Sequence, residues 1–226
     1  MRVAVLFSGG KDSTYAGWLA QHQCWDIPIL LTIAPSSQDS MMFHYPNVKW
    51  TRLQAQALGI KQHVVSTFAN NELEELEKSL NDVKKQYSVD GLVTGAVASD
   101  YQKSRIDQIC DRLQLKTYNP LWHKSSHRVA NDLHQAGLKI IFTRVAANGL
   151  DSSWLGHVIT GANWNRLMEL SKKYRFNLSG EGGEYETFVI DAPHFARRIE
   201  IEKGTIQSDG DAKTFVIESA SLHEKR

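Results

Sequence analysis

Short apolar runs alternate with helical patterns through the first half of the chain. Arg2 to Phe7 is an apolar, β-rich run that stops at Ser-Gly-Gly, and a helical pattern follows from Asp12 to Gln21. Ile27 to Ile33 is a second apolar run, and the same alternation continues to residue 113. The further elements expected are helices at 50–58, 73–87 and 105–113 and strands at 62–65 and 91–94. This order predicts an α/β fold, in which helices cover both faces of a parallel sheet.

The pattern changes after Pro120, Leu121 and Trp122. The elements expected there are helices at 129–136 and 164–174 and strands at 138–145, 185–190, 198–202 and 214–217. We therefore expect two domains, residues 1–125 and a smaller α+β domain at residues 126–226. They should pack closely, because no Pro-rich or low-complexity linker separates them.

Composition excludes several classes of protein. The 226 residues carry a net charge of +1, so no strong positive field attracts nucleic acid. The longest apolar run is too short to cross a membrane, and the start of the chain does not resemble a signal peptide. The two cysteines, Cys24 and Cys110, form no CxxC pattern. We expect a protein of the reducing cytoplasm with no membrane or nucleic-acid partner, while a homo-oligomer stays compatible with the sequence.

A glycine-containing loop joins the first strand to the first helix. This phosphate loop consists of Ser8, Gly9, Gly10, Lys11, Asp12 and Ser13. Backbone N–H groups and the positive end of the helix meet there, an arrangement that suits an anion. The glycines allow a tight turn, the serines supply hydroxyl groups, and Lys11 supplies a mobile positive charge. Asp12 can cap the helix or help to hold Mg²⁺.

The phosphate loop matches neither of the commoner glycine motifs. GxxxxGK[ST] and GxGxxG are both absent, which excludes the mononucleotide P-loop and the dinucleotide fingerprint. SGGKDS is instead similar to the SGGxDS loop of the PP-loop ATP pyrophosphatases. That resemblance implies a Rossmann-like fold of the HUP (adenine nucleotide alpha hydrolase-like) type and cleavage of ATP between its α and β phosphates. Lys11 and Asp12 would be catalytic, whereas the alternative is a glycine turn with an ordinary helix cap.

Two longer motifs make the resemblance more specific. Gly95 to Arg105 reads GAVASDYQKSR and Gly180 to Pro193 reads GEGGEYETFVIDAP, accompanied by MFH at Met42 to His44 and PLW at Pro120 to Trp122. Together they resemble the diphthine–ammonia ligases, ATP-binding enzymes that complete diphthamide on translation elongation factor 2. The resemblance spans nearly the whole chain. It implies amidation of diphthine by ammonium through an acyl-adenylate, with AMP and pyrophosphate as the other products.

Gly180 to Thr187, the glutamate segment, concentrates glycines and carboxylates. Its glycines let the backbone bend sharply, and Glu184 and Glu186 share a face if the chain there is extended. With Glu181, three carboxylates can bind Mg²⁺, orient ammonium or position the trimethylammonium of diphthine, and the sequence does not rank these roles. Glu184 and Glu186 are the predicted catalytic residues, and a solvated glycine hairpin is the alternative. The predicted substrate-binding residues of the segment are Glu181, Gly182, Gly183, Glu184, Tyr185, Glu186 and Thr187.

The other predicted substrate-binding residues follow the strand at 91–94. Ser99, Asp100 and Tyr101 come after its carboxyl end, the sheet edge that also carries the phosphate loop, so we expect them near ATP. Arg105 can reach a phosphate or the substrate carboxylate through its planar donors. An equally good interpretation makes Asp100 a plain helix cap.

Two other functions compete with the ligase. A PP-loop enzyme that modifies tRNA normally needs reactive cysteines or a basic surface, and neither is evident. A nucleotide-binding module without turnover would not need Lys11, Asp12 and the glutamates. His123 and His127 have the spacing of a metal pair on a helix, but no third ligand accompanies them.

Overall fold

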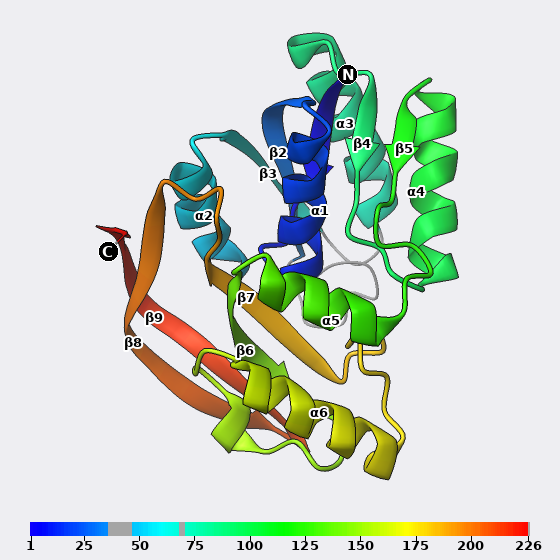
Figure 1. The fold of residues 1–226 in the computed structure, drawn as a ribbon. Helices are drawn as coiled ribbons and strands as arrows, with labels where there is room; N and C mark the ends of the chain where they lie inside the picture. The colour runs from blue at the N-terminus through cyan, green and yellow to red at the C-terminus, as the bar shows by residue number, and fades with distance from the viewer. Residues whose placement is uncertain (36–46, 68–70, 226) are drawn as a thin grey trace.

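The computed structural model describes residues 1–35, 47–67 and 71–225, so the motif at Met42 to His44 lies outside the described residues. A five-stranded parallel sheet lies next to a four-stranded antiparallel sheet (Figure 1). The strands of the parallel sheet are β1 (Arg2–Leu6), β2 (Asp26–Pro35), β3 (Lys61–Thr67), β4 (Gly91–Val93) and β5 (Lys116–Tyr118). The helices around it are α1 (Lys11–His22), α2 (Thr51–Leu58), α3 (Glu72–Tyr87) and α4 (Asp100–Arg112). In these described ranges no helix is long and apolar enough to span a membrane.

Successive side chains of the central strand β1 point to opposite faces of the sheet. Val3 and Val5 pack in one apolar cluster with residues of α1 and α2. Ala4 between them belongs to a second cluster, which contains residues of α3 and α4. The predicted parallel sheet with helices on both faces is therefore confirmed.

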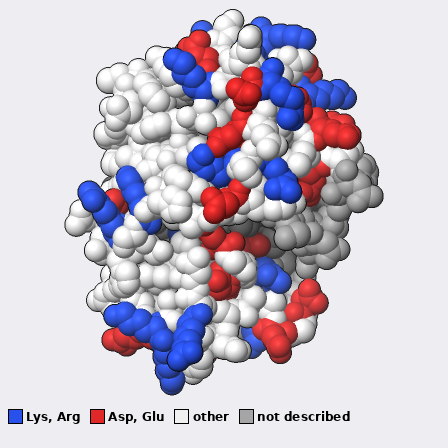
Figure 2. Space-filling view, turned by 90° about the vertical axis from the view of Figure 1, so that its right-hand side faces the viewer, with Lys and Arg blue, Asp and Glu red and all other residues white. Residues whose placement is uncertain are grey.

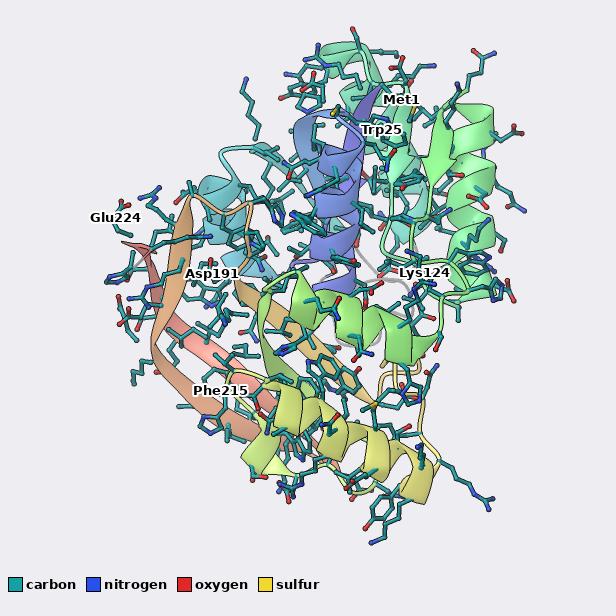
Figure 3. The ribbon with its side chains drawn as sticks, viewed as in Figure 1. Met1, Trp25, Lys124, Asp191, Phe215 and Glu224 are labelled. Carbon is teal, nitrogen blue, oxygen red and sulfur yellow. The ribbon has the colours of Figure 1, made fainter. Side chains whose placement is uncertain are left out.

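The strand order β3-β2-β1-β4-β5 places the switch point of the sheet between β1 and β4. Chain connections leave these two neighbouring strands in opposite directions, which opens a crevice at their carboxyl ends. Met1 and Trp25, which precede β1 and β2, lie at one end of the sheet, and Lys124 lies toward the other end (Figure 3). The carboxyl ends thus face the second sheet.

The second half of the chain is α+β, as predicted. It consists of α5 (Ser126–Gln135), β6 (Lys139–Val145), α6 (Gly161–Tyr174), β7 (Tyr185–Asp191), β8 (Arg197–Asp209) and β9 (Ala212–Glu224), with strand order β7-β6-β9-β8. The expected short strands at 198–202 and 214–217 are parts of a long hairpin. Much of β8 is exposed and polar, so no apolar run marks its full length.

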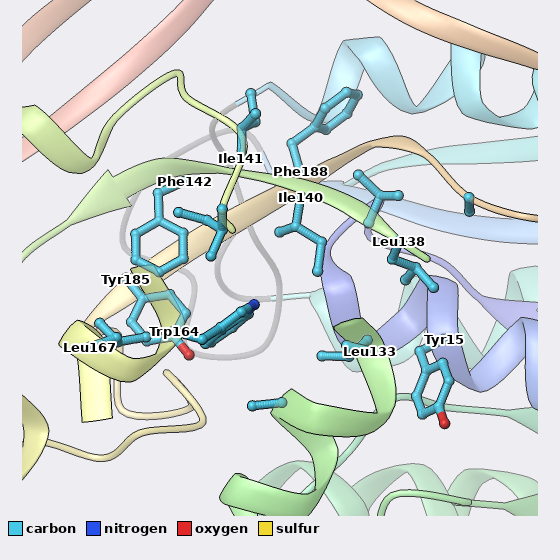
Figure 4. Close-up of a cluster of buried hydrophobic side chains, with 14 of the residues drawn as sticks. Tyr15, Leu133, Leu138, Ile140, Ile141, Phe142, Trp164, Leu167, Tyr185 and Phe188 are labelled. Atoms are coloured by element: carbon cyan, nitrogen blue, oxygen red, sulfur yellow. The ribbon is translucent and has the colours of Figure 1, made fainter. Parts of the chain in front are cut away.

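One apolar core joins the two sheets. Tyr15 of α1 packs in the same cluster as Phe142 of β6 and Tyr185 of β7, among side chains of α5 and α6 (Figure 4). Trp50, at the end of the 3₁₀ helix η1 (Val48–Trp50), donates its indole N–H to the carbonyl of Ile217 at 2.9 Å. The close packing expected of the two parts is present, and the division at residue 125 stays a prediction.

His194, just after β7, is expected to make the stability of the protein depend on pH. Burial lowers the pKa of His194 from 6.5 to about 4, and the positive charge of Lys225 adds to this effect. Between these two values the unfolded chain binds a proton that the folded chain does not, so stability should fall as pH drops from 6.5 toward 4. Urea titrations across this range should show a shallower slope for His194→Gln. The exposed His157→Gln should keep the wild-type slope, and an unchanged slope in His194→Gln would contradict the assignment.

Candidate functional site

A pocket lies at the switch point of the parallel sheet. Its cavity volume is about 130 Å³, well above the ~10–15 Å³ that one water molecule needs. The lining residues from the phosphate loop are Ser8, Gly10, Lys11, Asp12 and Ser13, and those from the glutamate segment are Gly180, Glu181, Tyr185, Glu186 and Thr187. Two motifs that lie far apart in the sequence therefore share one pocket.

β7 and α2 hold the phosphate loop directly. The Lys11 N–H donates to Thr187 Oγ1 at 3.1 Å, and the Val189 N–H donates to the Gly9 carbonyl at 3.0 Å. Gln54 of α2 donates its Nε2 to the carbonyls of both Gly9 and Val189, each at 2.8 Å. The conformation of the loop thus depends on contacts from both halves of the chain. Sequence reasoning missed Gln54, because a polar residue on an amphipathic helix looks like a solvated one.

Replacing Gln54 should destabilise the phosphate loop. Its side chain is fully buried, and Gln54→Leu would remove the amide that serves two buried carbonyls. A buried polar group left without its partner costs about 1–3 kcal/mol, so we expect a loss of that size in the urea unfolding free energy. Gln56→Leu, at an exposed position of the same helix, is the matched control. Equal stability of the two variants would show that the Gln54 contacts do not hold the loop.

Lys11 is a fixed charge, and the expectation of a mobile one is wrong. The residue is 5% exposed, and its Nζ donates to Asp12 Oδ2 at 2.6 Å and to the Ser179 carbonyl at 2.7 Å. Burial acts to lower the pKa of Lys11, but the negative charges of Asp12 and Glu181 and the nearby Tyr185 more than reverse this and raise it. Lys11 therefore stays positively charged in the pocket.

The aromatic ring of Tyr185 lies beside the Lys11 ammonium group. Its ring centroid lies 5.4 Å from Lys11 Nζ and 4.4 Å from the stacked ring of Phe142. The hydroxyl donates to the Leu178 carbonyl at 2.6 Å. Burial raises the pKa of Tyr185 to about 12, so the phenol is neutral. The residue joins the pocket to the shared core.

The carboxylates of Glu184 and Glu186 do not share a face. β7 begins at Tyr185, so Glu184 lies in the preceding turn and accepts hydrogen bonds from the backbone N–H groups of Asn177 (3.0 Å) and Gly182 (2.8 Å). Glu186 lines the pocket. Figure 2 shows acidic side chains around a hollow near the middle of the face that it views. Of the predicted catalytic glutamates, only Glu186 is therefore placed to meet a molecule in the pocket.

Glu181 contacts the loop after β4, which comprises residues 94–98 and is called the β4 loop below. Its two carboxylate oxygens accept hydrogen bonds from the backbone N–H groups of Val97 (2.6 Å) and Ala98 (2.5 Å). Burial raises the pKa of Glu181, and the two N–H donors act in the opposite direction. A residue predicted to bind the substrate is thus bonded to the protein's own backbone.

The residues predicted on α4 lie beside the pocket rather than in it. Ser99 caps the helix, since its Oγ accepts the N–H of Gln102 at 3.3 Å, so the interpretation of Asp100 as the cap is wrong. With the helix starting at Asp100, Tyr101 and Arg105 lie one turn apart, and the guanidinium is 3.4 Å from the ring centroid. Gln102, which was not predicted, lines the pocket. Among the described residues, the predicted ones outside the lining are Gly9, Ser99, Asp100, Tyr101, Arg105, Gly182, Gly183 and Glu184.

Comparison with known proteins identifies the family of this chain. The family model of the diphthamide synthase N-terminal domain matches residues 1–117, and that of the C-terminal domain matches residues 125–223. The diphthine–ammonia ligase of Mus musculus is 32% identical over 223 residues, covering 89% of this chain and 83% of the relative. The diphthine–ammonia ligase of Danio rerio is 33% identical over 222 residues, covering 89% and 87%.

A solved structure, a predicted subunit of tRNA methyltransferase from Methanocaldococcus jannaschii, covers 85% of this chain and 98% of its own. With a TM-score of 0.43 and 16% identity, this likeness bears on neither the fold nor the function. The two family models, by contrast, account for both halves of the chain, and the relatives match along most of their length. The chain therefore belongs to the diphthamide synthase family.

Proposed function

We propose that this protein is an ATP-dependent diphthine–ammonia ligase. It would join ammonium to the carboxylate of diphthine on translation elongation factor 2 and release diphthamide, AMP and pyrophosphate. The observation that carries the proposal is the shared pocket, in which the phosphate loop and the glutamate segment are hydrogen-bonded to each other. Membership of the family and the names of the relatives support the choice of substrate.

The phosphate loop is suited to bind the phosphates of ATP. It leads into the amino end of α1, where N–H groups and the helix dipole attract an anion. Lys11 is held nearby as a buried positive charge, with two of its three N–H donors bonded to protein oxygens. A fixed charge of this kind stabilises negative charge that develops during the reaction without having to reorganise.

Asp12 fits a ligand of Mg²⁺. Its Oδ1 is buried and has no hydrogen-bond partner in the described part of the chain, while Oδ2 is paired with Lys11. Within the same residues no group of three or more His, Cys, Asp or Glu side chains is arranged to hold a metal. Mg²⁺ commonly binds one or two carboxylates together with phosphate oxygens and waters, so this single carboxylate would suffice beside ATP. The ion would neutralise charge on the phosphates.

Ammonia cannot readily displace an oxygen of a free carboxylate, because that oxygen is a poor leaving group. The carboxylate must therefore be activated first. A carboxylate oxygen of diphthine attacks the α-phosphorus of ATP, and the bond from that phosphorus to pyrophosphate breaks. Ammonia then attacks the acyl carbon, and AMP departs with the former carboxylate oxygen. Ammonium loses one proton to become the attacking ammonia, and the nitrogen loses a second proton after the attack; both protons go to solvent or to a carboxylate. Glu186 lines the pocket, and we assign it to orient ammonium, because a carboxylate attracts the cation and accepts its hydrogen bonds.

The cysteines argue against a thiolating tRNA enzyme. Cys110 is buried, and burial raises its pKa to about 12, so it has little thiolate character. Cys24 is exposed just beyond the end of α1, and neither cysteine is among the residues that line the pocket. The nucleotide-binding module without turnover stays an alternative that kinetics can test.

The test is product analysis with purified protein, elongation factor 2 that carries diphthine, ATP, Mg²⁺ and ammonium. We expect AMP, pyrophosphate and diphthamide in equal amounts, and no AMP when the factor or ammonium is left out. Glu186→Gln should raise the KM for ammonium more than the KM for ATP. Formation of ADP instead of AMP would contradict the proposal, and ATP binding without any turnover would favour the nucleotide-binding module.

A further inference from the structure

Three chain segments surround the pocket, and each of them contacts the other two. Lys11 of the phosphate loop is bonded to the Ser179 carbonyl, directly before the glutamate segment. Gly95 of the β4 loop lies so close to the first turn of α1 that a Cβ added to it would be 2.6 Å from the Asp12 carbonyl carbon. Glu181 makes the third contact, between the glutamate segment and the β4 loop. The three contacts close a ring around the pocket.

The Glu181 contact is built from two charge-assisted hydrogen bonds. Each carboxylate oxygen accepts one backbone N–H, from Val97 at 2.6 Å and from Ala98 at 2.5 Å. Bonds in which one partner is ionised are shorter and about twice as strong as neutral ones. Two donors on consecutive residues also fix the orientation of the loop and not only its distance.

The carbonyl and the side chain of Val97 also restrain the β4 loop. The Val97 carbonyl accepts the N–H of His123 at 2.8 Å, and the Val97 side chain is buried in the core that both sheets share. Directly after the loop, Ser99 caps α4, which brings Gln102 into the pocket lining. Without Glu181, the N–H groups of Val97 and Ala98 would lose the carboxylate that ties the β4 loop to the glutamate segment.

We infer that Glu181 is a positioning residue, which keeps the β4 loop against the phosphate loop and thereby keeps the pocket in the shape that binds ATP. Each carboxylate oxygen is bonded to a backbone donor, so we assign the side chain to holding the loop rather than to the reacting atoms. The inference rests on the proposed use of ATP and assigns Glu181 a different role from Glu186.

The direction in which the affinity for ATP changes when Glu181 is removed separates a positioning role from a direct electrostatic effect on ATP. Both carboxylate oxygens of Glu181 accept backbone N–H groups, and Lys11 and Asp12 lie close enough for their charges to influence its pKa. If Glu181 acted on ATP only through its charge, its removal would relieve repulsion of the phosphates and tighten ATP binding. If it holds the ring closed, its removal weakens ATP binding.

The experiment is isothermal titration calorimetry of the full chain with ATP, without the elongation factor, at limiting and at saturating Mg²⁺. We expect Glu181→Ala to bind ATP about tenfold more weakly, which corresponds to ~1.4 kcal/mol, at either Mg²⁺ concentration. Glu181→Gln should lose less, since its amide oxygen still accepts one N–H. Acetate added to Glu181→Ala should restore part of the affinity, because it can supply a carboxylate to the two N–H groups.

Asp151→Ala is the matched control. Asp151 also accepts a backbone N–H with its carboxylate, from Ser153 at 2.9 Å, but it caps the 3₁₀ helix η2 (Ser152–Trp154) and does not line the pocket. The Asp151→Ala variant should bind ATP as tightly as the wild type, and acetate should not change its affinity. Acetate that strengthens binding in both variants would overturn the inference.

Other outcomes are equally decisive. Unchanged or tighter ATP binding by Glu181→Ala, or a loss that saturating Mg²⁺ removes, would overturn the positioning role. If Glu181→Ala fails to fold, hydrogen exchange at the Val97 and Ala98 amides of Glu181→Gln replaces it, with faster exchange expected and unchanged exchange contradictory. A wild-type protein that does not bind ATP would overturn the proposed function itself, which the variants alone cannot do.

Discussion

Replacing Gly95 by alanine is expected to lower the rate of diphthamide formation by about 10²-fold, the effect of displacing catalytic groups by about 1 Å. A Cβ at this position would lie 2.6 Å from the carbonyl carbon of Asp12 and 2.6 Å from the backbone nitrogen of Ser13. These are backbone atoms, so no side chain can turn away, and the first turn of α1 must separate from the β4 loop. Forcing extra atoms into a packed site costs about 1–3 kcal/mol, which urea titration should detect as lower stability.

Gly17→Ala provides the matched control for Gly95→Ala. Gly17 lies on the same helix, α1, but a Cβ added there would meet Val5 Cγ1 at 3.6 Å, an ordinary van der Waals distance. Alanine is favoured over glycine inside a helix by up to ~1 kcal/mol, so this variant should be as stable as the wild type or more stable, and fully active. Normal turnover of Gly95→Ala, or equal losses in the two variants, would show that close packing at Gly95 does not shape the site.

Lys11→Met should lower the turnover rate by at least ~10²–10³-fold, the usual effect of deleting one group that stabilises a transition state. The substitution also leaves the Asp12 carboxylate without the cation 2.6 Å away from it. Breaking a buried ion pair by removing one partner costs up to ~3–5 kcal/mol. We therefore expect both activity and stability to fall, measured by single-turnover kinetics and urea titration.

A double variant separates the two effects of Lys11. Lys11→Met with Asp12→Asn leaves no unpaired charge, so it should recover part of the stability that Lys11→Met loses, but none of the activity. Lys103→Met is the control, because Lys103 also forms an ion pair, with Asp107 one turn along α4, but does not line the pocket, so its turnover rate should equal that of the wild type. If Lys11→Met turned over ATP at the wild-type rate, Lys11 would have no part in the chemistry.

The elements of the fold could be predicted because their signals are local. The alternation of apolar runs and helical spacing predicted the parallel sheet, and the first strand, turn and helix located the phosphate loop. β5 (Lys116–Tyr118) was missed, since its sequence KTY is not an apolar run, whereas the equally short β4 is apolar and buried. The start of α4 was placed too late, because the polar residues of its first turn hide the helix.

The internal contacts of the site could not be predicted, since they join residues that are distant in sequence. Glu181, Glu184 and Glu186 look equivalent along the chain, but Glu184 bonds to its own turn, while Glu181 and Glu186 line the pocket and Glu181 also bonds to the β4 loop. Their separation depends on where β7 begins and on how the second sheet packs. Gln54 gave no signal at all, because its role exists only once α2 lies against the phosphate loop.

The measurement that tests the central claim most directly follows the oxygen atoms of the substrate. Elongation factor 2 whose diphthine carboxylate carries heavy oxygen (18O) is allowed to react once with ATP, Mg²⁺ and ammonium. If the carboxylate attacks the α-phosphorus, AMP should contain one labelled oxygen and diphthamide should keep the other. Unlabelled AMP, or label in inorganic phosphate together with ADP, would contradict the account.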